Sequence, residues 1–556
     1  MKTSKILSVI LALALVFAMA VPMAVSALDE DASITIIPPS SLSIDESYFT
    51  AYKLFDVTLT TIGGKGYAYV PAAELNAFLA VPANAAKYGT PAEFKLFLES
   101  SPTDAELKEL TRDISDSGLF SAAGDVDNDD PNVVISGLDY GYYLVAGKGL
   151  AAGDQDVFSL STLVTVEDEN IDIHLKADAP AIDKWVYNTN ADIDDWYKWA
   201  DANIGDTVDF RHLSAVPDMT GYDVYTYIVH DIMSKGLTFN PATVGIKVGG
   251  VSVPKTHFVV DSDEIVAGDV GTNHIVAGDV GGTKITITII GFLASYIENA
   301  GDVIEITYSA LLNSDAVIGV PGNPNVVWLE YSNNPYDTTA TPGEPGTPGE
   351  PGEPGTPGTP GTPGETGETP EDEVVVYTFD LDIFKYTGEM GEGKELDKDY
   401  FAIPGTEFNL KAGGTPISFV DLTDGSYRVA TPAEIATADA TTITLVSSAS
   451  GLIHIEGLDA GVYSLAETRA SNGFNALTEE IEIFIVHDGN TTPGVSIVYI
   501  DDIPVEVVNV YNGSGDQLPE TGGIGVYIFY VTGAILTAGL ALYFIMRRRR
   551  NILNVK

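Results

Sequence analysis

Three polar residues fall on the apolar faces of strands predicted near the C-terminal end of the chain. Alternation of apolar and polar residues gives Lys385 a buried position at the end of the strand 379–385. The same alternation buries Glu467 in the strand 463–467 and Asn509 in the strand 505–509. An unpaired buried charge costs several kcal/mol. A lysine, an acid and an asparagine in one apolar interior therefore need a chemical reason to be there.

A lysine, a carboxylic acid and an amide in a shared interior can form an isopeptide bond. Burial lowers the pKa of a lysine and raises that of a carboxylic acid, so that both groups can be neutral. The neutral amine attacks the amide carbon, while the protonated acid polarises the carbonyl and relays protons as ammonia leaves. The residue pattern alone fits equally well a lysine–glutamate pair that is hydrogen-bonded to the asparagine.

A second set of the same kind occurs in the middle of the chain. Lys184 shares the buried face of a strand with Ile182, and Asn333 lies on the buried face of the strand 327–333. Asn334 is adjacent, but alternation favours Asn333.

The two ends of the chain carry export and anchoring signals. Residues 1–27 combine two lysines, an apolar core and a small-residue ending, which indicates a secretory signal peptide rather than a membrane anchor helix. Near the other end, an apolar stretch at 524–546 is long enough to span a bilayer. Four arginines at 547–550 keep its far end on the cytoplasmic side.

A short motif precedes this apolar stretch. It consists of Leu518, Pro519, Glu520, Thr521 and Gly522. The orientation of the stretch places the motif at the outer face of the membrane.

Composition excludes several classes of function. The formal net charge of −51 argues against nucleic acid or an anionic membrane as a partner. The chain has no cysteine, so any covalent stapling is of another kind than a disulfide. No EF-hand spacing and no set of nucleophile, histidine and acid is legible. We expect no cofactor, no metal and no enzyme with turnover.

The mature part of the chain divides into β-rich segments and one tract of low complexity. The first segment also carries helical patterns around 71–80, 91–98 and 104–114. We predict an all-β protein of tandem immunoglobulin-like β-sandwiches, the first with helical insertions, plus a C-terminal transmembrane helix. The expected divisions are a signal peptide at 1–27, domains at 28–178, 179–337 and 374–513, a spacer at 338–373 and a sorting segment at 514–556.

The spacer has a glycine at every third position from Gly343 to Gly367. Such a tract cannot bury a core, and we expect an extended polyproline II conformation. At about 3.1 Å per residue it would reach on the order of 100 Å. A collagen triple helix shares the period but needs three chains in register, so a semi-rigid spacer is favoured.

The third segment resembles a known family of domains. Tyr-Ser-Leu-Ala-Glu-Thr at 463–468, followed by Gly473 and Phe474, resembles the E-box of CnaB-type pilin domains, with Phe in place of the usual Tyr. The resemblance implies a bond between Lys385 and Asn509, catalysed by Glu467. Asn512 is a weaker candidate for the linked asparagine.

The second segment is similar to the D2 domain of SpaA-type major pilins, also called the SpaA/FctA type. Three stretches carry the similarity, at 204–208, 230–237 and 331–335. The resemblance implies a bond between Lys184 and Asn333, with Asp231 as the acid and Glu305 as the alternative.

The first segment has no inward lysine on its first strand. Its stretch 137–145 resembles an E-box strand without the glutamate. We therefore expect no isopeptide bond there.

The motif and tail at 518–550 resemble the cell-wall sorting signal of Gram-positive surface proteins. In that family a sortase cleaves between Thr and Gly and transfers the Thr carbonyl to an amine. For pilins the amine is a lysine near the end of the first domain. Lys176 matches that place and faces solvent by alternation; Lys198 is the alternative.

These resemblances imply a structural subunit of a covalent pilus shaft, anchored to peptidoglycan outside a Gram-positive cell. The implied partners are a class C pilus sortase, a housekeeping sortase, further copies of the chain and peptidoglycan, with minor pilins and host ligands as additional candidates. A monomeric wall-anchored adhesin and a basal pilin are the alternatives, and the long spacer favours the adhesin.

Overall fold

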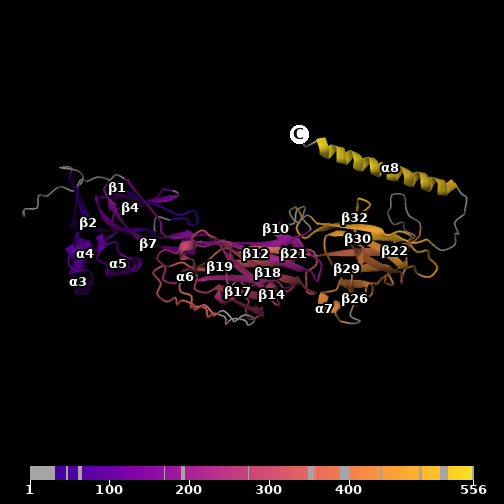
Figure 1. The fold of residues 1–556 in the computed structure, drawn as a ribbon, viewed down its shortest axis with the longest axis horizontal. Coiled ribbons are helices and arrows are strands. Elements are labelled where there is room, and N and C mark those ends of the chain that lie inside the picture. Colours follow the sequence, from indigo (N-terminus) through magenta and orange to yellow (C-terminus); the bar gives the residue numbers. More distant parts are fainter. Residues whose placement is uncertain are drawn as a thin grey trace, which may run out of the picture.

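The computed structural model forms an elongated row of three β-rich domains, with the long C-terminal helix apart from them (Figure 1). It describes residues 32–44, 48–60, 66–129, 131–153, 155–167, 170–189, 195–272, 274–347, 356, 358–388, 400–437, 441–487, 491–513 and 524–553.

The first domain consists of two four-stranded sheets and a helical cover. One sheet has the order β4-β5-β1-β8 and the other β3-β2-β6-β7. The strands are β1 (Ala32–Ile37), β2 (Thr50–Thr60), β3 (Gly66–Pro71), β4 (Asp125–Asp129), β5 (Asn132–Leu138), β6 (Gly141–Ala151), β7 (Gln155–Val166) and β8 (Asn170–His174).

Four helices of the first domain connect β3 to β4. They are α2 (Ala73–Ala80), α3 (Pro82–Tyr88), α4 (Pro91–Glu99) and α5 (Asp104–Ser117). The predictions of α2, α4 and α5 are confirmed, and capping boxes start α4 at Thr90 and α5 at Thr103. The helix α3 was not predicted because it is short and follows α2 after one residue. Its Tyr88 packs with Phe78 and Phe94 over β2 and β6.

The second domain is a larger sandwich. Its sheets have the orders β10-β9-β12-β18-β14-β15 and β11-β21-β19-β13-β17-β16, with β20 beside β19. The elements are β9 (Ile182–Asn188), β10 (Asp195–Tyr197), β11 (Trp199–Asp201), β12 (Thr207–Ala215), β13 (Tyr227–Met233), β14 (Leu237–Val248), β15 (Val251–Ser252), η2 (Lys255–His257), β16 (Phe258–Glu264), η3 (Ala277–Asp279), β17 (Thr283–Ile289), α6 (Phe292–Tyr296), η4 (Ile297–Asn299), β18 (Val303–Leu312), β19 (Asn323–Ser332), β20 (Thr366–Glu368) and β21 (Asp372–Tyr377).

The third domain pairs its first strand with its last. Its sheets have the orders β23-β22-β29-β27-β26, with β34 beside β22, and β25-β24-β30-β31-β32-β33, with β28 beside β24. The elements are β22 (Phe379–Thr387), β23 (Phe401–Ala402), β24 (Glu407–Ala412), β25 (Thr415–Pro416), β26 (Phe419–Thr423), β27 (Ser426–Val429), α7 (Pro432–Ile435), β28 (Leu445–Val446), β29 (Leu452–Leu458), β30 (Gly461–Arg469), β31 (Ile481–His487), β32 (Ser496–Ile500), β33 (Ile503–Val505) and β34 (Val508–Tyr511).

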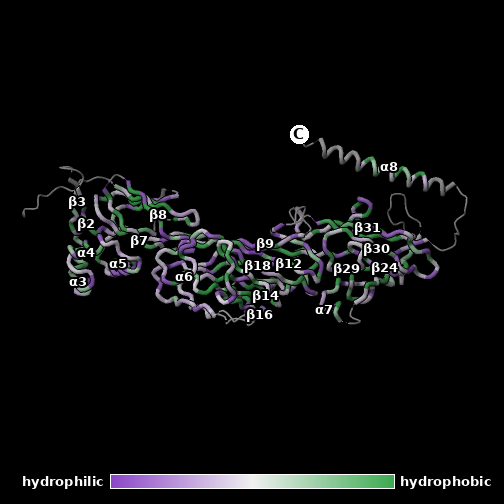
Figure 2. The backbone as a smooth tube through the Cα atoms, in the orientation of Figure 1, coloured by the Kyte–Doolittle hydropathy of each residue, from purple (hydrophilic) through white to green (hydrophobic). Residues whose placement is uncertain are grey.

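Alternation along the strands forms the cores. Hydrophobic and hydrophilic residues alternate along the strands of all three domains (Figure 2). In β9, for example, Ile182, Lys184 and Val186 are buried while Asp183 is exposed. One apolar core continues from the second domain into the third. Only Thr378 separates β21 from β22, so these two domains are closely joined.

The glycine–proline tract is not an extended spacer between domains. Its two arms run antiparallel and meet at three bridges, Thr341 with Thr362, Glu344 with Thr359 and Thr347 with Thr356. The prediction of a spacer at 338–373 is therefore wrong. The chain returns to the second domain as β20 and β21, which pair with β19. That domain thus extends to Tyr377 rather than ending at residue 337.

The glycine period has a packing reason that the sequence alone did not show. A Cβ on Gly343 would lie 2.8 Å from the backbone of Gly361 and of Thr359. A Cβ on Gly361 would overlap the carbonyl oxygen of Thr341. The bridges recur at every third residue along both arms, so glycine with the same period lets the two backbones approach. The arms also rest on the second domain, where Gly343 and Gly358 face Ile290.

The segment after the third domain forms α8 (Ile524–Leu553), which covers the predicted span at 524–546. Across the residues that the structure describes, we find no helix that is both long enough and apolar enough to cross a membrane. The signal peptide at 1–27 lies outside the described residues.

The glycine packing of the arms generates a testable expectation. Gly361→Ala forces a methyl group against the Thr341 carbonyl and should destabilise the paired arms by about 1–3 kcal/mol. Hydrogen exchange measured by mass spectrometry should then show faster exchange of the paired amides of Thr341, Glu344 and Thr359. Gly268→Ala is the matched control, because a Cβ there meets nothing within 4 Å. Unchanged protection in Gly361→Ala would contradict the close packing.

Candidate functional site

The third domain holds a closed triangle of hydrogen bonds between a lysine, a glutamate and an asparagine. The Lys385 Nζ on β22 donates to Glu467 Oε2 at 3.0 Å and to Asn512 Oδ1 at 2.6 Å. Asn512 Nδ2 donates to Glu467 Oε1 at 2.7 Å. The side chains of Lys385 and Glu467 are 0% exposed, and Asn512 is 1% exposed. The amine therefore touches the amide that it would attack, beside an acid that touches both.

Burial lowers the pKa of this lysine. Removal from water lowers the pKa of Lys385 from 10.5 to about 8, although the hydrogen bond and charge of Glu467 act in the opposite direction. A proton therefore leaves this amine more readily than it leaves an exposed lysine. Glu467 lies at hydrogen-bond distance to accept it.

Asn509 is not part of this triangle. Its side chain is exposed, and its Nδ2 donates to the carbonyl of Val507 at 3.3 Å. The inward face of β34 carries Val508 and Val510 and continues to Asn512. The predicted alternation was displaced by one residue, which moves every side chain of a strand to the opposite face. The weaker candidate, Asn512, is the asparagine that contacts Lys385.

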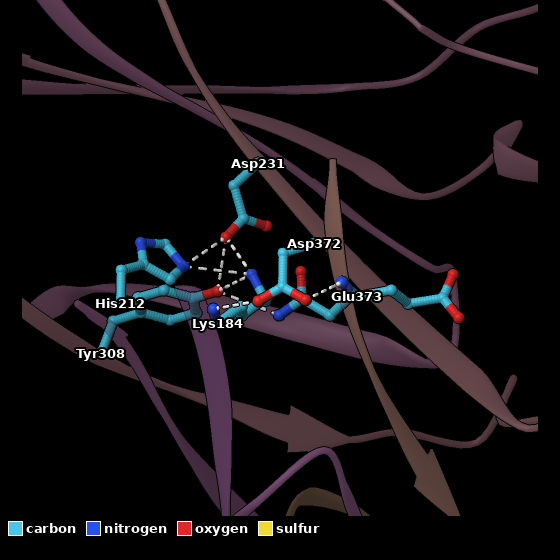
Figure 3. A network of polar contacts seen from close by, with 7 residues as sticks. Lys184, His212, Asp231, Tyr308, Asp372 and Glu373 are labelled. Atoms are coloured by element: carbon cyan, nitrogen blue, oxygen red, sulfur yellow. Dashed lines mark hydrogen bonds and ion pairs between the residues drawn. The ribbon is translucent and has the colours of Figure 1, made fainter. Parts of the chain in front are cut away.

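The second domain buries a related network between its two sheets (Figure 3). Lys184 on β9 forms a short ion pair with Asp231 on β13, and both are at most 1% exposed. Tyr308 Oη on β18 donates to Asp231 Oδ2 at 2.6 Å and accepts from Lys184 Nζ at 2.8 Å. Asn325 Nδ2 on β19 donates to the same hydroxyl at 2.9 Å. One tyrosine thus connects the lysine, the acid and an asparagine.

Two oxygen atoms of this network lack hydrogen-bond partners in the described part of the chain. They are Asn325 Oδ1 and Asp231 Oδ1, both buried. A protonated Asp231 would supply a donor where Asn325 offers an unused acceptor. Unpaired buried polar atoms cost about 1–3 kcal/mol each, so this pattern fits groups arranged for reaction rather than for stability alone.

A buried histidine completes the second network. His212 Nε2 on β12 lies 3.1 Å from Lys184 Nζ and 3.1 Å from Asp231 Oδ2. Burial, helped by the charge of Lys184, lowers the pKa of His212 to about 4. The imidazole is therefore neutral near pH 7 and can accept a hydrogen bond from the lysine.

Opposing effects act on the two charged groups. Burial lowers the pKa of Lys184 to about 8 against the attraction of Asp231. Burial acts to raise the pKa of Asp231, the charge of Lys184 acts to lower it, and the net result is a lowered pKa. The resting state is therefore an ion pair. A single proton transfer within it gives a neutral amine beside a neutral acid.

Asn333 does not reach Lys184. Its Nδ2 donates to the carbonyl of Asp156 in the first domain at 2.9 Å. Asp231 is paired in register with Val327, and Asn333 lies six residues beyond Val327, about 20 Å along an extended strand. Asn325 lies two residues from Val327 on the same face. Among the described residues, Asn325 rather than Asn333 is the asparagine whose side chain joins the Lys184 network.

The alternative acid of the second domain is also outside the network. Glu305 forms an ion pair with Lys247 at 2.8 Å and is partly exposed. Asp231, predicted as the acid, contacts Lys184 directly.

Three residues of the second network were missed from the sequence. They are His212, Tyr308 and Asn325. Each lies on a buried face by alternation, with Phe210 before His212, Ile306 before Tyr308 and Val327 after Asn325. A search for every polar residue that alternation places on the buried face of a strand would have found them.

The two candidate polymerisation lysines have different surroundings. Lys176 follows β8 and is exposed, and no hydrogen bond or ion pair of its side chain occurs within the described ranges. Lys198 instead donates to the carbonyl of Lys184 at 2.6 Å and pairs with Asp372 at 2.5 Å. Its amine also lies 4.4 Å from the ring of Trp185.

Two further predictions concern other regions. In the first domain, Lys53 pairs with Asp56 at 2.6 Å and with Asp139 at 3.0 Å, and neither partner is an asparagine. The motif Leu518, Pro519, Glu520, Thr521 and Gly522 lies outside the described residues.

Comparison with protein families gives three matches along the chain. The model of the Gram-positive pilin backbone subunit 2, Cna-B-like domain matches residues 204–335. The SpaA prealbumin-like fold domain matches residues 392–497, and the LPXTG cell wall anchor motif matches residues 511–552. The chain carries the domains and the anchor of a Gram-positive pilin backbone subunit. This pilin is accordingly a structural subunit, anchored to the cell wall in an extracellular pilus.

Solved structures of pilins show remote likeness to this pilin. The T6 backbone pilin of Streptococcus pyogenes is 16% identical, covers 88% of this chain and 94% of its own, and has a TM-score of 0.44. SpaD of Corynebacterium diphtheriae is 15% identical, covers 88% of this chain and 98% of its own, and has a TM-score of 0.45. SpaA of the same organism is 14% identical, covers 86% of this chain and 99% of its own, and has a TM-score of 0.42. Each TM-score is below 0.5, so none of these likenesses defines the fold. No curated protein matches the chain.

The lowered pKa of Lys385 generates a prediction on stability. In Asn512→Ala the amine has no amide to contact, and its folded pKa of about 8 lies below its usual 10.5. Above about pH 8 the unfolded chain then binds more protons than the folded one, so the free energy of unfolding rises with pH. Between pH 7.5 and 9.5 the gain should be about 1–2 kcal/mol.

Calorimetry of the third-domain transition measures this gain. The control is Asn512→Ala combined with Lys385→Met, which removes the titrating amine. The difference in the free energy of unfolding between the two variants should narrow as the pH rises. If the free energies of unfolding of the two variants changed in parallel with pH, burial would not lower the pKa of Lys385.

Proposed function

We propose that this pilin forms the shaft of a sortase-assembled covalent pilus and that two intramolecular isopeptide bonds stabilise each subunit. The observation that carries the proposal is the closed contact of Lys385, Glu467 and Asn512. An amine, an amide and an acid within hydrogen-bond distance of one another are the reactants and the catalyst of that bond.

In the third domain the bond would join Lys385 to Asn512. Lys385 first passes a proton to Glu467. The neutral Nζ attacks Cγ of Asn512 while Glu467 donates to the carbonyl oxygen. The C–N bond to Nδ2 then breaks, and Glu467 relays the proton that lets ammonia leave. Amine and amide become one secondary amide plus ammonia, and each group reacts once, so the chain is not an enzyme with turnover.

In the second domain the bond would join Lys184 to Asn325, with Asp231 as the acid. Tyr308 holds both reactants on one hydroxyl, and the unused Asn325 oxygen is the atom that a protonated Asp231 would polarise. His212 is a positioning residue that accepts from the amine and keeps it close to Asp231. The bond would link β9 of one sheet to β19 of the other.

Polymerisation would use the two chain positions expected from the sequence. A class C sortase would cleave between Thr521 and Gly522 and transfer the Thr521 carbonyl to Lys176 of the next copy. The exposed amine of Lys176, which has no side-chain partner among the described residues, suits this role better than Lys198, which is held by Asp372. A housekeeping sortase would transfer the last subunit to peptidoglycan.

A monomeric adhesin was favoured by a spacer that gives reach. Since the glycine–proline arms fold back onto the second domain, that observation no longer supports the adhesin. We propose domains at 28–178, 179–377 and 378–513, followed by the sorting segment.

The intact mass of the exported chain, residues 28–521, tests both bonds. We expect a shortfall of two ammonia molecules. Asn512→Ala and Asn325→Ala should each lose one ammonia fewer, and the double variant should show none. Asn509→Ala and Asn333→Ala are the matched controls and should keep both losses. A parent chain without any shortfall removes the proposed bonds, and a change in either control reassigns the asparagine.

Blots of wall extracts test polymerisation. The parent chain should give a ladder of high-mass species, and Lys176→Ala should reduce it to the monomer, because the acyl-enzyme then lacks its amine. Lys198→Ala should keep the ladder. A single band from the parent would favour the monomeric adhesin.

A further inference from the structure

We propose that a pocket between the first and second domains binds a sugar that carries a carboxylate, such as a uronic acid or a sialic acid. The proposal goes beyond the covalent assembly of the shaft and does not depend on the isopeptide bonds. It rests on the pocket, on the aromatic rings and hydroxyl groups in its wall, and on one arginine without an acidic partner.

The pocket lies where the first domain meets the second. β7 is at the end of the first domain that faces the second domain (Figure 1). The wall comes from β2, α5, β6 and β7 and from residues 334 and 336, which follow β19 of the second domain. Its volume of about 470 Å³ falls in the range of about 300–1,000 Å³ that small-molecule sites occupy.

Hydrogen bonds between the two domains hold this wall in place. Phe158 N donates to the carbonyl of Asn333 at 2.8 Å, and Asn333 Nδ2 donates to the carbonyl of Asp156 at 2.9 Å. The backbone N–H of Ser161 donates to the hydroxyl of Tyr336 at 2.9 Å. A ligand would therefore enter a preformed site and lose little free energy in ordering it.

Four aromatic side chains line the pocket, and each is partly exposed. They are Tyr48, Tyr52, Phe158 and Tyr336. The C–H groups on one face of a sugar ring are apolar and pack against such rings, whereas its hydroxyls need polar partners at the edge. Thr50 and Ser115 supply hydroxyls in the same wall, and neither side chain has a hydrogen-bond partner within the described ranges.

Arg112 on α5 is the group that would hold the carboxylate. Its Nη2 donates to the carbonyl of Tyr336 at 3.1 Å, which keeps the guanidinium at the pocket. Among the described residues it forms no ion pair. Because the chain has 79 acidic and only 28 basic residues, a cation without an acidic partner is unusual here. The remaining N–H groups of a guanidinium can bind a carboxylate through two parallel hydrogen bonds.

The other charged groups of the wall restrict the ligand further. Lys148 pairs with Asp156 at 2.5 Å and lies 4.2 Å from the ring of Tyr48, so its charge is already balanced. Asp116 would repel a second negative charge on the ligand. At physiological salt, charges more than about 8 Å away are largely screened, so these local groups outweigh the net charge of the chain. The pocket therefore suits one carboxylate rather than a polyanion.

The place of the pilin gives such a site access to sugars. This pilin is anchored outside the cell, where polysaccharides and glycoproteins present single carboxylates on sugar rings. An acidic peptide is the competing ligand, and the sorting segment of a second copy is the nearest source of one. The aromatic rings and free hydroxyls favour the sugar.

Ligand-observed NMR on the exported chain, residues 28–521, tests the proposal. The probes are the methyl glycosides of glucuronic acid, of N-acetylneuraminic acid and of glucose. The glucuronide and the glucoside differ only in whether C6 is a carboxylate or a hydroxymethyl group. For the better of the two acidic sugars we expect a Kd on the order of 1 mM, and binding of the glucoside should be roughly tenfold weaker. The acidic sugar that binds better identifies the class of glycan.

Variants locate the binding. Arg112→Gln should weaken the acidic sugar roughly tenfold and leave the glucoside unchanged, since only the carboxylate loses its partner. Arg112→Lys keeps the charge without the planar fork and should give an intermediate Kd. Ser115→Phe fills the pocket and should abolish binding of all three sugars. Arg469→Gln is the matched control, because Arg469 is 68% exposed in the third domain, and it should bind as the parent does.

Four results would overturn the proposal. They are no binding of either acidic sugar by the parent, equal binding of glucuronide and glucoside, unchanged binding in both Arg112→Gln and Ser115→Phe, and displacement of the sugar by a tighter-binding Leu-Pro-Glu-Thr peptide. The last result would assign the pocket to a second copy of the chain. The intact mass of each variant should still show the loss of two ammonia molecules, so this proposal and the proposed function can fail separately.

Discussion

The hydrogen bonding of a buried lysine amine is the interaction on which the rest of this pilin depends. A lysine in an apolar core is unfavourable by itself, and both domains that contain one surround it with acceptors. In the third domain Glu467 and Asn512 take the amine of Lys385. In the second domain, the amine of Lys184 is within hydrogen-bond distance of Asp231, Tyr308 and His212. Strand order then follows, since these contacts require particular strands to meet.

The two sites solve the same problem at different places in the sandwich. In the third domain the lysine strand β22 and the strand before Asn512, β34, are neighbours in one sheet and run parallel. In the second domain β9 and β19 belong to opposite sheets. A bond there would tie the sheets face to face, where no backbone ladder connects them. The extra groups, Tyr308 and His212, bridge the wider gap between the sheets.

Sequence patterns predicted the fold class, and they predicted which lysines and acids come into contact better than which asparagines join them. Lys385 and Lys184 lie inside strands, where the apolar neighbours on both sides define which residues face the core. Alternation alone does not separate Asn325 from Asn333, because both follow the same alternation as Val327. Asn512 lies beyond the end of β34, where few neighbours remain to define the face. A shift of one residue therefore exchanged Asn509 for Asn512. For Asn333 the parity was consistent, but parity says nothing about the distance along a strand, and that distance excludes it.

The glycine–proline arms show a second limit. The composition predicts the local conformation of each residue, and the glycine period is the same in an isolated rod, a triple helix and a pair of antiparallel arms. Which of these forms depends on where the chain is next held. Here β20 and β21 return to β19, and no local pattern announces that pairing, because its partner lies on the other side of the tract.

Covalent closure and noncovalent closure have opposite consequences for a fibre. A crosslink between first and last strands removes the enclosed residues from the path of tension and restricts the unfolded chain. The proposed bonds would do this for the second and third domains, where Lys184 and Lys385 are buried. In the first domain, β1 is held beside β8 by backbone pairing, which ends when the strands are pulled apart.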